Sequence, residues 1–138
     1  MNSKQILRGL TTVSFYAENI DAAKKWYTEM LGINPYFERP GYVEFRIGDY
    51  QHELGIIDKR YAPKNSVAGT GGAVVYWHVD DVKAFVEKLI SNGAKEYEPI
   101  TKRGEGFITA SIIDPFGNIL GIMYNRHYLD VLSSINIQ

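Results

Sequence analysis

Two stretches of similar pattern decide the fold of this chain: NIDAAKKWYTEMLG, from Asn19 to Gly32, and DDVKAFVEKLISNG, from Asp80 to Gly93. Each begins with a residue type that caps helices, carries apolar residues at helical spacing and ends in a glycine that stops a helix. The second stretch follows the first by 61 residues at both ends (80 − 19 and 93 − 32). The sequence therefore predicts two equivalent helices in a duplicated unit.

Short runs of β-branched and aromatic residues flank both helices and predict strands. Both halves give one strand, the helix and then three strands, and both halves end in Leu-Gly-Ile. The predicted strands cover residues 10–16, 34–37, 42–47 and 51–57 in the first half and residues 73–79, 96–100, 106–113 and 118–124 in the second. This order predicts an α+β fold made of two β-α-β-β-β modules.

The boundaries of the modules follow from the same pattern, and we expect both modules to form a single domain. Module one covers about 10–57, a polar linker rich in Gly, Pro, Ser and Asn covers 58–72, module two covers about 73–124, and a tail covers 125–138. The apolar residues of the tail are Tyr128, Leu129, Val131 and Leu132. They predict a short amphipathic helix that packs either on its own domain or across a dimer interface.

Composition and charge restrict the function. Hydrophobic residues make up 45% and charged residues 22%, which is typical of a soluble globular protein. Fifteen Lys and Arg face sixteen Asp and Glu, so we expect neither nucleic acid nor an anionic membrane as a partner. The absence of cysteine excludes disulfides, thiolate metal ligands and a Cys nucleophile. Residues 1–8 lack the apolar core of a signal peptide and no apolar run could span a bilayer, so we expect a cytoplasmic protein.

Three short motifs, in this order along the chain, resemble those of a known family. They are Trp26-Tyr27 followed by Leu31-Gly32, then Asn92-Gly93-Ala94, and finally Asp114-Pro115-Phe116-Gly117-Asn118. Together they resemble the vicinal-oxygen-chelate superfamily of glyoxalases, bleomycin-resistance proteins and extradiol dioxygenases, over about residues 10–124. The resemblance implies that the modules form an incomplete barrel with a pocket on the concave face, and that the protein is a homodimer.

The resemblance also identifies the positions where metal-dependent members of the family bind one divalent ion. They fall on Thr12, on Glu53 or Gly55 depending on the alignment, on Val74 and on Gly121. Valine and glycine have no side-chain donor, and threonine is a poor ligand for such a metal. At most one of the four ligands is therefore retained. We expect no cofactor, and a divalent metal is disfavoured.

Strand alternation predicts which side chains share the concave face. The expected set is Thr12, Ser14, Tyr16, Glu53, Gly55, Val74, Tyr76, His78, Ile119, Gly121 and Met123. Four further residues on strands, Tyr36, Tyr42, Arg46 and Phe107, would add aromatic surface and one fixed cation to a pocket wall. Such a wall suits an aromatic or carboxylate-bearing small molecule, although the same residues could simply stabilise neighbouring strands.

Glu53 and His78 are the candidate catalytic residues. Burial on an apolar wall would raise the pKa of Glu53 towards that of a general base. Alternatively, Glu53 pairs with an arginine or faces solvent. His78 could act as an acid or base near neutral pH, or could be a structural residue at the edge of the sheet.

Three functions are compatible with these residues. The first is a protein that binds a small organic molecule in the concave groove without the family's metal. The second is a glyoxalase/lyase- or isomerase-type enzyme with Glu53 as general base or as the sole retained metal ligand. The third is a non-catalytic interaction scaffold.

Overall fold

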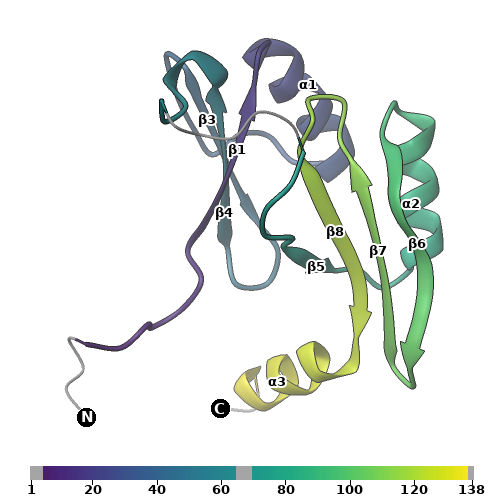
Figure 1. The fold of residues 1–138 in the computed structure, drawn as a ribbon. Helices are drawn as coiled ribbons and strands as arrows, with labels where there is room; N and C mark the ends of the chain where they lie inside the picture. Colours follow the sequence, from purple (N-terminus) through teal and green to yellow (C-terminus); the bar gives the residue numbers. More distant parts are fainter. Residues whose placement is uncertain (1–4, 65–69, 137–138) are drawn as a thin grey trace. The chain divides into compact units, whose positions relative to one another are not determined.

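The computed structural model describes residues 5–64 and 70–136, and the chain divides into two compact units, residues 1–64 (unit 1) and 65–138 (unit 2). Each unit contains a mixed four-stranded sheet and at least one helix (Figure 1). Neither sheet closes into a barrel. The α+β fold with a repeated strand-helix-strand-strand-strand order is therefore confirmed, whereas the prediction of a single domain is not tested.

Unit 1 begins with strand β1 (Thr12–Ala17) and helix α1 (Ile20–Leu31). Its remaining strands are β2 (Phe37–Arg39), β3 (Tyr42–Ile47) and β4 (His52–Asp58), and a short 3₁₀ helix, η2 (Lys59–Tyr61), follows. The strand order is β1-β4-β3-β2. β1 is parallel to β4 and the other neighbours are antiparallel, so the first and last strands of the unit lie side by side.

Helix α1 forms where the sequence provides both of its ends. The side chain of Asn19 accepts a hydrogen bond from the backbone N–H of Ala22 at 3.0 Å, and Gly32 closes the helix with a φ of 70°. Tyr27 is buried between Phe15 and Phe45, with ring centroids 6.3 and 6.5 Å away. Burying a side chain of this size stabilises the fold by about 1.5–3 kcal/mol. One face of the sheet is thus covered by α1.

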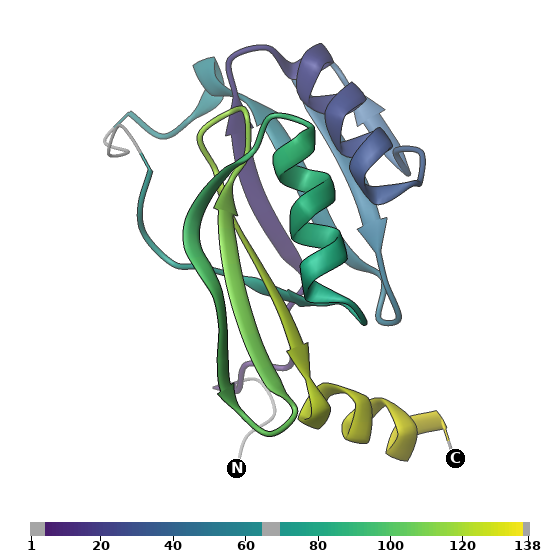
Figure 2. The same cartoon turned by 90° about the vertical axis from the view of Figure 1, so that its right-hand side faces the viewer.

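Unit 2 repeats this arrangement and adds a third helix. Its elements are β5 (Tyr76–His78), α2 (Val82–Ser91), β6 (Lys95–Gly104), β7 (Phe107–Ile113), β8 (Ile119–Asn125) and α3 (Arg126–Asn136). The strand order is β5-β8-β7-β6, with β5 parallel to β8. Helix α2 lies along one face of this sheet (Figure 2) and buries Val82, Val86 and Leu89. Helix α3, which the tail sequence predicted, follows directly from the end of β8.

The turn between β7 and β8 is built by Asp114. This buried carboxylate accepts hydrogen bonds from the backbone N–H groups of Phe116 and Asn118 at 2.9 and 2.8 Å. Gly117 has a φ of 92°, a conformation that glycine adopts without strain. The motif thereby fixes the register of β8 against β7.

Several predicted boundaries differ from the structure. The N-cap of α2 is Asp81, not Asp80, because Asp81 accepts the hydrogen bond from Ala84 while Asp80 lies 3.3 Å from the ring of His78. The predicted strand 73–79 is reduced to β5, and 34–37 is largely a loop before β2. The strand predicted at 96–100 extends instead from Lys95 to Gly104.

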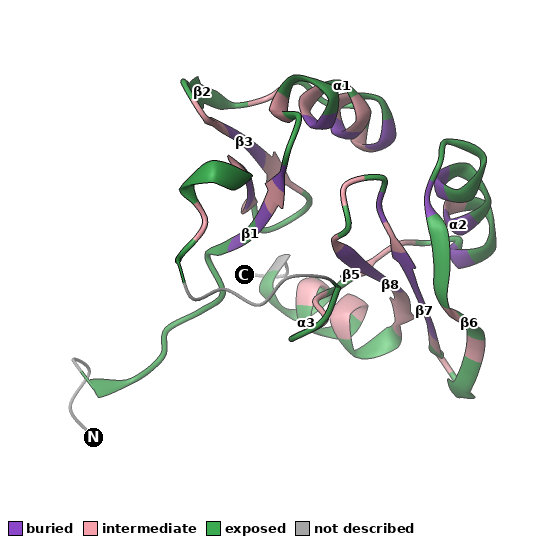
Figure 3. Ribbon diagram, turned by 45° about the horizontal axis from the view of Figure 1, so that its top comes forward, coloured by how far each residue is buried: buried purple, intermediate pink, exposed green. Residues whose placement is uncertain are grey.

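Buried residues occur on the strands of both sheets (Figure 3). They alternate with exposed or half-buried residues in β1, whereas β3, β4, β7 and β8 each contain a run of three or four consecutive buried residues. In β1, Val13, Phe15 and Ala17 are buried on the side of α1, and Thr12 and Ser14 on the other face are exposed. The sheet face away from α1 or α2 is called the open face of each unit. No helix in the described residues is long and apolar enough to span a bilayer.

Candidate functional site

Strand register places the residues expected from the first half on the open face of unit 1. Thr12 and Arg46 both pair with Glu53, from β1 and β3 respectively. Gly55 is flanked in the same way by Ser14 and Glu44. The alternation used to select Thr12, Ser14, Glu53 and Gly55 is thus confirmed, although their role in binding stays a prediction.

The side chains of this face form one connected cluster around Arg46. Thr12 Oγ1 donates a hydrogen bond to Glu53 Oε1 at 2.6 Å. The guanidinium of Arg46 lies with Nη2 3.9 Å from Glu53 Oε2 and Nε 3.6 Å from Glu44 Oε2. Its carbon atom Cζ lies 3.6 Å from the centre of the Tyr36 ring, within the range of a cation–π contact. Arg46 is therefore held by charge and stacking.

Tyr42 completes the unit 1 cluster. Its hydroxyl donates to Glu44 Oε1 at 2.8 Å, and its ring lies over Gly55. Burial, followed by the hydrogen bond to Glu44 and that residue's negative charge, raises the pKa of Tyr42 to about 12. The phenol is therefore a hydrogen-bond donor at neutral pH and not a base.

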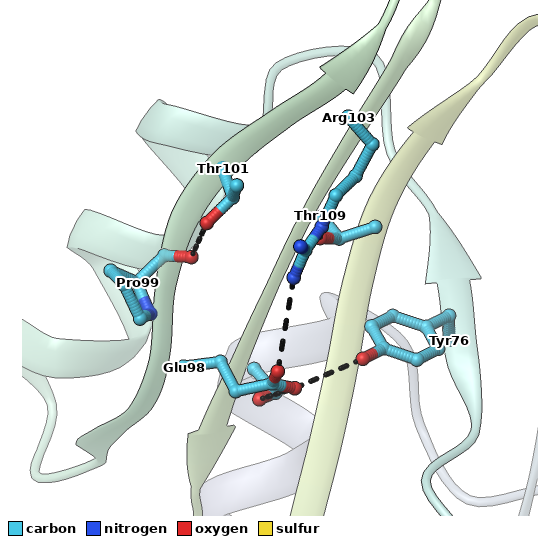
Figure 4. A network of polar contacts seen from close by, with 7 residues as sticks. Tyr76, Glu98, Pro99, Thr101, Arg103 and Thr109 are labelled. Carbon is cyan, nitrogen blue, oxygen red and sulfur yellow. Dashed lines mark hydrogen bonds and ion pairs between the residues drawn. The ribbon is translucent and has the colours of Figure 1, made fainter.

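Unit 2 carries a second cluster on its open face (Figure 4), centred on Glu98. Tyr76 Oη and Ser111 Oγ both donate to Glu98 Oε1, each at 3.1 Å. Arg103 donates from Nε to Thr109 Oγ1 at 3.1 Å and places Nη2 3.9 Å from Glu98 Oε2. Burial, together with the bond to Glu98, also raises the pKa of Tyr76. Of these five residues, the sequence had indicated only Tyr76.

The residues that sequence analysis missed differ in how easily they could have been found. Glu44 lies between Tyr42 and Arg46 at alternate positions of β3, and Thr109 and Ser111 continue the alternation from Phe107 on β7. Alternation alone would have found these three. Glu98 and Arg103 could not be found in this way, because three irregularities shift the register along β6.

His78 is bound into its own unit on both sides of the ring. Nδ1 accepts a hydrogen bond from the backbone N–H of Asn125 at 3.1 Å, so in the neutral ring Nε2 carries the proton and donates to Asp80 at 3.3 Å. The ring stacks on Tyr128 of α3 with centroids 4.8 Å apart, and the side chain is 7% exposed. These contacts connect β5 to the start of α3, and the acid–base role of His78 stays a prediction.

The remaining predicted residues belong to neither cluster, although Met123 and Phe107 lie beside Thr109 of the unit 2 cluster. Tyr16 pairs with Ile57 at the far end of β1, and Met123 pairs with His78 and Thr109. Phe107 is an exposed residue at the start of β7. Ile119 is buried at the start of β8, and Val74 precedes β5.

The residues at the family's metal positions do not fit a divalent ion. Thr12 and Glu53 are hydrogen-bonded to each other, and Val74 offers no donor. A Cβ added at Gly121 would lie 2.6 Å from the backbone oxygen of Val75 and 2.7 Å from Cδ1 of Tyr76, so no larger residue could replace this glycine without displacing the backbone. Among residues 5–64 and 70–136, no three His, Cys, Asp or Glu side chains are grouped as metal ligands would be.

The two-module fold and these open faces define a class of α+β protein with paired strand-helix-strand repeats. A family model described as the Glyoxalase/Bleomycin resistance protein/Dioxygenase superfamily matches residues 9–122, which is most of the chain. The protein therefore belongs to this superfamily, as its sequence motifs had indicated. A search of curated protein sequences found no significant match.

Solved structures with the same fold have different functions in their names. A glyoxalase-related enzyme from Fulvimarina pelagi is 17% identical, with a TM-score of 0.70 over 87% of this chain and 90% of that one. A lactoylglutathione lyase from Agrobacterium tumefaciens is 20% identical, with a TM-score of 0.65 over 86% and 94%. The bleomycin resistance determinant encoded on the transposon Tn5 is also 20% identical, with a TM-score of 0.61 over 86% and 98%. At these identities the likeness establishes the fold alone.

Proposed function

We propose that this chain binds a small organic molecule on its open faces and does so without the divalent metal of its family. One observation carries the proposal. In each unit a tyrosine ring covers the glycine of the Leu-Gly-Ile motif, Tyr42 over Gly55 and Tyr76 over Gly121, and its hydroxyl holds a glutamate that lies beside an arginine. Aromatic surface and paired charges thus stand at or near the positions that metal ligands hold in other members.

Arg46 supports this proposal most directly. Within the described part of the chain, no side chain accepts a hydrogen bond from its guanidinium, because the nearest carboxylate oxygens lie 3.6 and 3.9 Å away. Among the described residues its buried Nε atom has no hydrogen-bond partner, which costs about 1–3 kcal/mol for an unsatisfied donor. Because Nε is buried, a planar ligand with a carboxylate or carbonyl oxygen would instead accept hydrogen bonds from the terminal nitrogens of the 36% exposed side chain, beside Tyr36.

The relatives support a ligand-binding role without identifying the ligand. One structural relative is named as a bleomycin resistance determinant and another as a lactoylglutathione lyase. The proposal includes a cytoplasmic homodimer that binds neither nucleic acid nor membranes, in keeping with a net charge of −1.

Calorimetric titration of the chelator-treated protein tests both parts of the proposal. We expect Zn²⁺, Ni²⁺, Mn²⁺ and Fe²⁺ to bind more weakly than about 1 mM, corresponding to less than ~4 kcal/mol. We expect at least one member of a panel of small aromatic carboxylates to bind, and Arg46→Gln to weaken that binding. Tight stoichiometric metal binding that is lost in Glu53→Gln would overturn the metal-free proposal, and a panel without any binder would favour an interaction scaffold.

An enzyme of the glyoxalase/lyase or isomerase type is the second candidate, and Glu53 is the observation that favours it. Its side chain is 27% exposed on the open face, and Oε1 accepts a hydrogen bond from Thr12. Oε2 lies 3.9 Å from Arg46 Nη2 and accepts no hydrogen bond from the described residues, so this oxygen would be the one to take a proton from a substrate. Loss of turnover in Glu53→Gln with unchanged ligand affinity would support this candidate over a simple binding protein.

A further inference from the structure

The carboxylate of Glu98 is anchored on one side only. Oε1 accepts hydrogen bonds from Tyr76 and from Ser111, and Ser111 is fully buried. These two donors fix the orientation of the carboxylate against the sheet, and Figure 4 shows Tyr76 pointing toward it. Oε2 accepts no hydrogen bond within the described residues. Its cationic neighbour Arg103 places Nη2 3.9 Å away, which is too far for a hydrogen bond.

Arg103 is anchored in the same one-sided way. Its Nε donates to Thr109, a buried residue two positions from Ser111 on the same strand face. In the described part of the chain its terminal nitrogens donate no hydrogen bond. The side chains of Glu98 and Arg103 are 40% and 48% exposed, so an acceptor and a set of donors stand side by side within reach of a ligand.

The cluster is neutral as a whole. Glu98 contributes one negative charge and Arg103 one positive charge, while the raised pKa of Tyr76 keeps its phenol uncharged. A purely cationic ligand would be repelled by Arg103 and a purely anionic one by Glu98. A ligand that carries both charges on neighbouring atoms satisfies both side chains at once.

An apolar surface adjoins the two charges. Phe107 lies two residues before Thr109 on the same face of β7 and is 42% exposed. Met123 pairs directly with Thr109 from β8. A ligand held by its charged end could therefore place an apolar group on this part of the sheet.

We propose that unit 2 recognises an amino-acid-like zwitterion, with its ammonium group on Glu98 and its carboxylate on Arg103. This inference rests on the proposed ligand-binding function and specifies the chemistry of the ligand. Ser111, Thr109 and Tyr76 act as positioning residues, since they hold Glu98 and Arg103 in place. The apolar side chain of the ligand packs on Phe107.

Three probes with the same phenyl group test the charge requirement: L-phenylalanine, phenethylamine and 3-phenylpropionate. They carry both charges, the positive charge alone and the negative charge alone. We expect the amide signals of β6 and β7 in the NMR spectrum of the ¹⁵N-labelled protein to shift with phenylalanine. Its affinity should exceed that of either other probe by about tenfold or more, which corresponds to at least roughly 1.4 kcal/mol. Equal affinity of a singly charged probe would overturn the proposal.

Matched variants identify the residues responsible. Glu98→Gln retains an acceptor for Tyr76 and Ser111, so the sheet should remain intact, but phenylalanine should bind about tenfold more weakly. Glu105→Gln is the control, because it removes one negative charge from the same hairpin, where the exposed Lys102 is the ion-pair partner of Glu105 among the described residues. The control should leave the affinity within about twofold of the wild type. Equal effects of the two variants would contradict a specific role of Glu98.

The outcomes separate this inference from the proposed function. If phenylalanine fails to bind while an aromatic carboxylate binds and depends on Arg46, the zwitterion site is wrong and the proposed function stands. If neither binds, both are wrong. Phenylalanine binding that shifts β3 and β4 signals and is unaffected in Arg103→Gln would also overturn the assignment to unit 2.

Discussion

The two units reach the same local arrangement from different strands. In unit 1 the tyrosine, glutamate and arginine are Tyr42, Glu44 and Arg46, which alternate along β3. In unit 2 the tyrosine comes from β5, and the glutamate and arginine come from β6. The duplicated backbone and its glycine are shared, whereas the side chains of the clusters occupy non-equivalent positions. The glycine is therefore the common requirement, and the source of the ring that covers it is variable.

The largest expected difference between the units is in the stability that each loses when its Leu-Gly-Ile glycine is replaced by alanine. A Cβ at Gly121 would meet the backbone oxygen of Val75 at 2.6 Å, whereas the nearest atoms to a Cβ at Gly55 belong to the side chain of Tyr42, at 2.8 and 2.9 Å. A side chain can move aside more easily than a backbone. We expect Gly121→Ala to lower the free energy of unfolding by about 3 kcal/mol and Gly55→Ala by about 1 kcal/mol or less. Urea denaturation measures both, and a larger loss in Gly55→Ala would break the comparison.

Removing the tyrosine hydroxyls should give a smaller difference in stability between the units, and here the variant in unit 1 should lose more stability than the variant in unit 2. Tyr42→Phe takes the hydrogen-bond donor from Glu44, which is buried, and should cost about 1–3 kcal/mol. Tyr76→Phe leaves Glu98 partly exposed and still bonded to Ser111, so its cost should stay below about 1 kcal/mol. Thermal and urea unfolding of the two variants measure both losses of stability. Equal losses in Tyr42→Phe and Tyr76→Phe would indicate that the greater burial of Glu44 has no effect on stability.

The smallest effect is on the pH dependence of stability. The pKa of Tyr42 is raised to about 12 in the folded protein, against about 10 in an unfolded chain. Its contribution is therefore complete below pH 10 and is lost as the pH rises towards 12, because the unfolded chain loses this proton first. At Tyr76, the charge of Arg103 opposes the rise in pKa. The free energy of unfolding, measured by urea denaturation from pH 9 to 11.5, should fall less steeply in Tyr42→Phe than in the wild type. Tyr76→Phe should reduce this pH-dependent loss of stability by less than Tyr42→Phe does. If the free energy of unfolding of Tyr42→Phe fell with pH as steeply as that of the wild type, the prediction would be contradicted.

The sequence predicted those parts of the molecule that depend on local pattern. Helical caps and stops gave both core helices, and strand alternation correctly placed Thr12, Glu53 and Gly55 on one face. The Leu-Gly-Ile repeat located two glycines in equivalent pairings. The cap at Asp81 was missed because two aspartates are adjacent, and they are distinguished by contacts in the folded chain: Asp81 accepts the hydrogen bond from Ala84, and Asp80 lies beside His78.

The cluster of unit 2 depends on contacts that no local pattern specifies. Glu98 meets Tyr76 across the sheet, from a strand that is separated by two others in the strand order. Its partner Arg103 reaches the same face only because β6 is irregular. Regular alternation, which was sufficient for unit 1, therefore assigns these two residues to opposite faces.

That irregularity makes the length of β6, as much as its composition, a determinant of the site. Glu98 and Arg103 are five residues apart, an odd spacing that sends two side chains to opposite faces of a regular strand. The register shift between Glu98 and Thr101 restores a common face. Deleting a single residue at this bulge would leave the pair four residues apart in a regular strand and so still on a common face, whereas straightening the strand at its present length would keep every charge in the chain yet separate the pair. The spacing of the two residues and the irregularity of β6 must therefore match for related chains to share this arrangement.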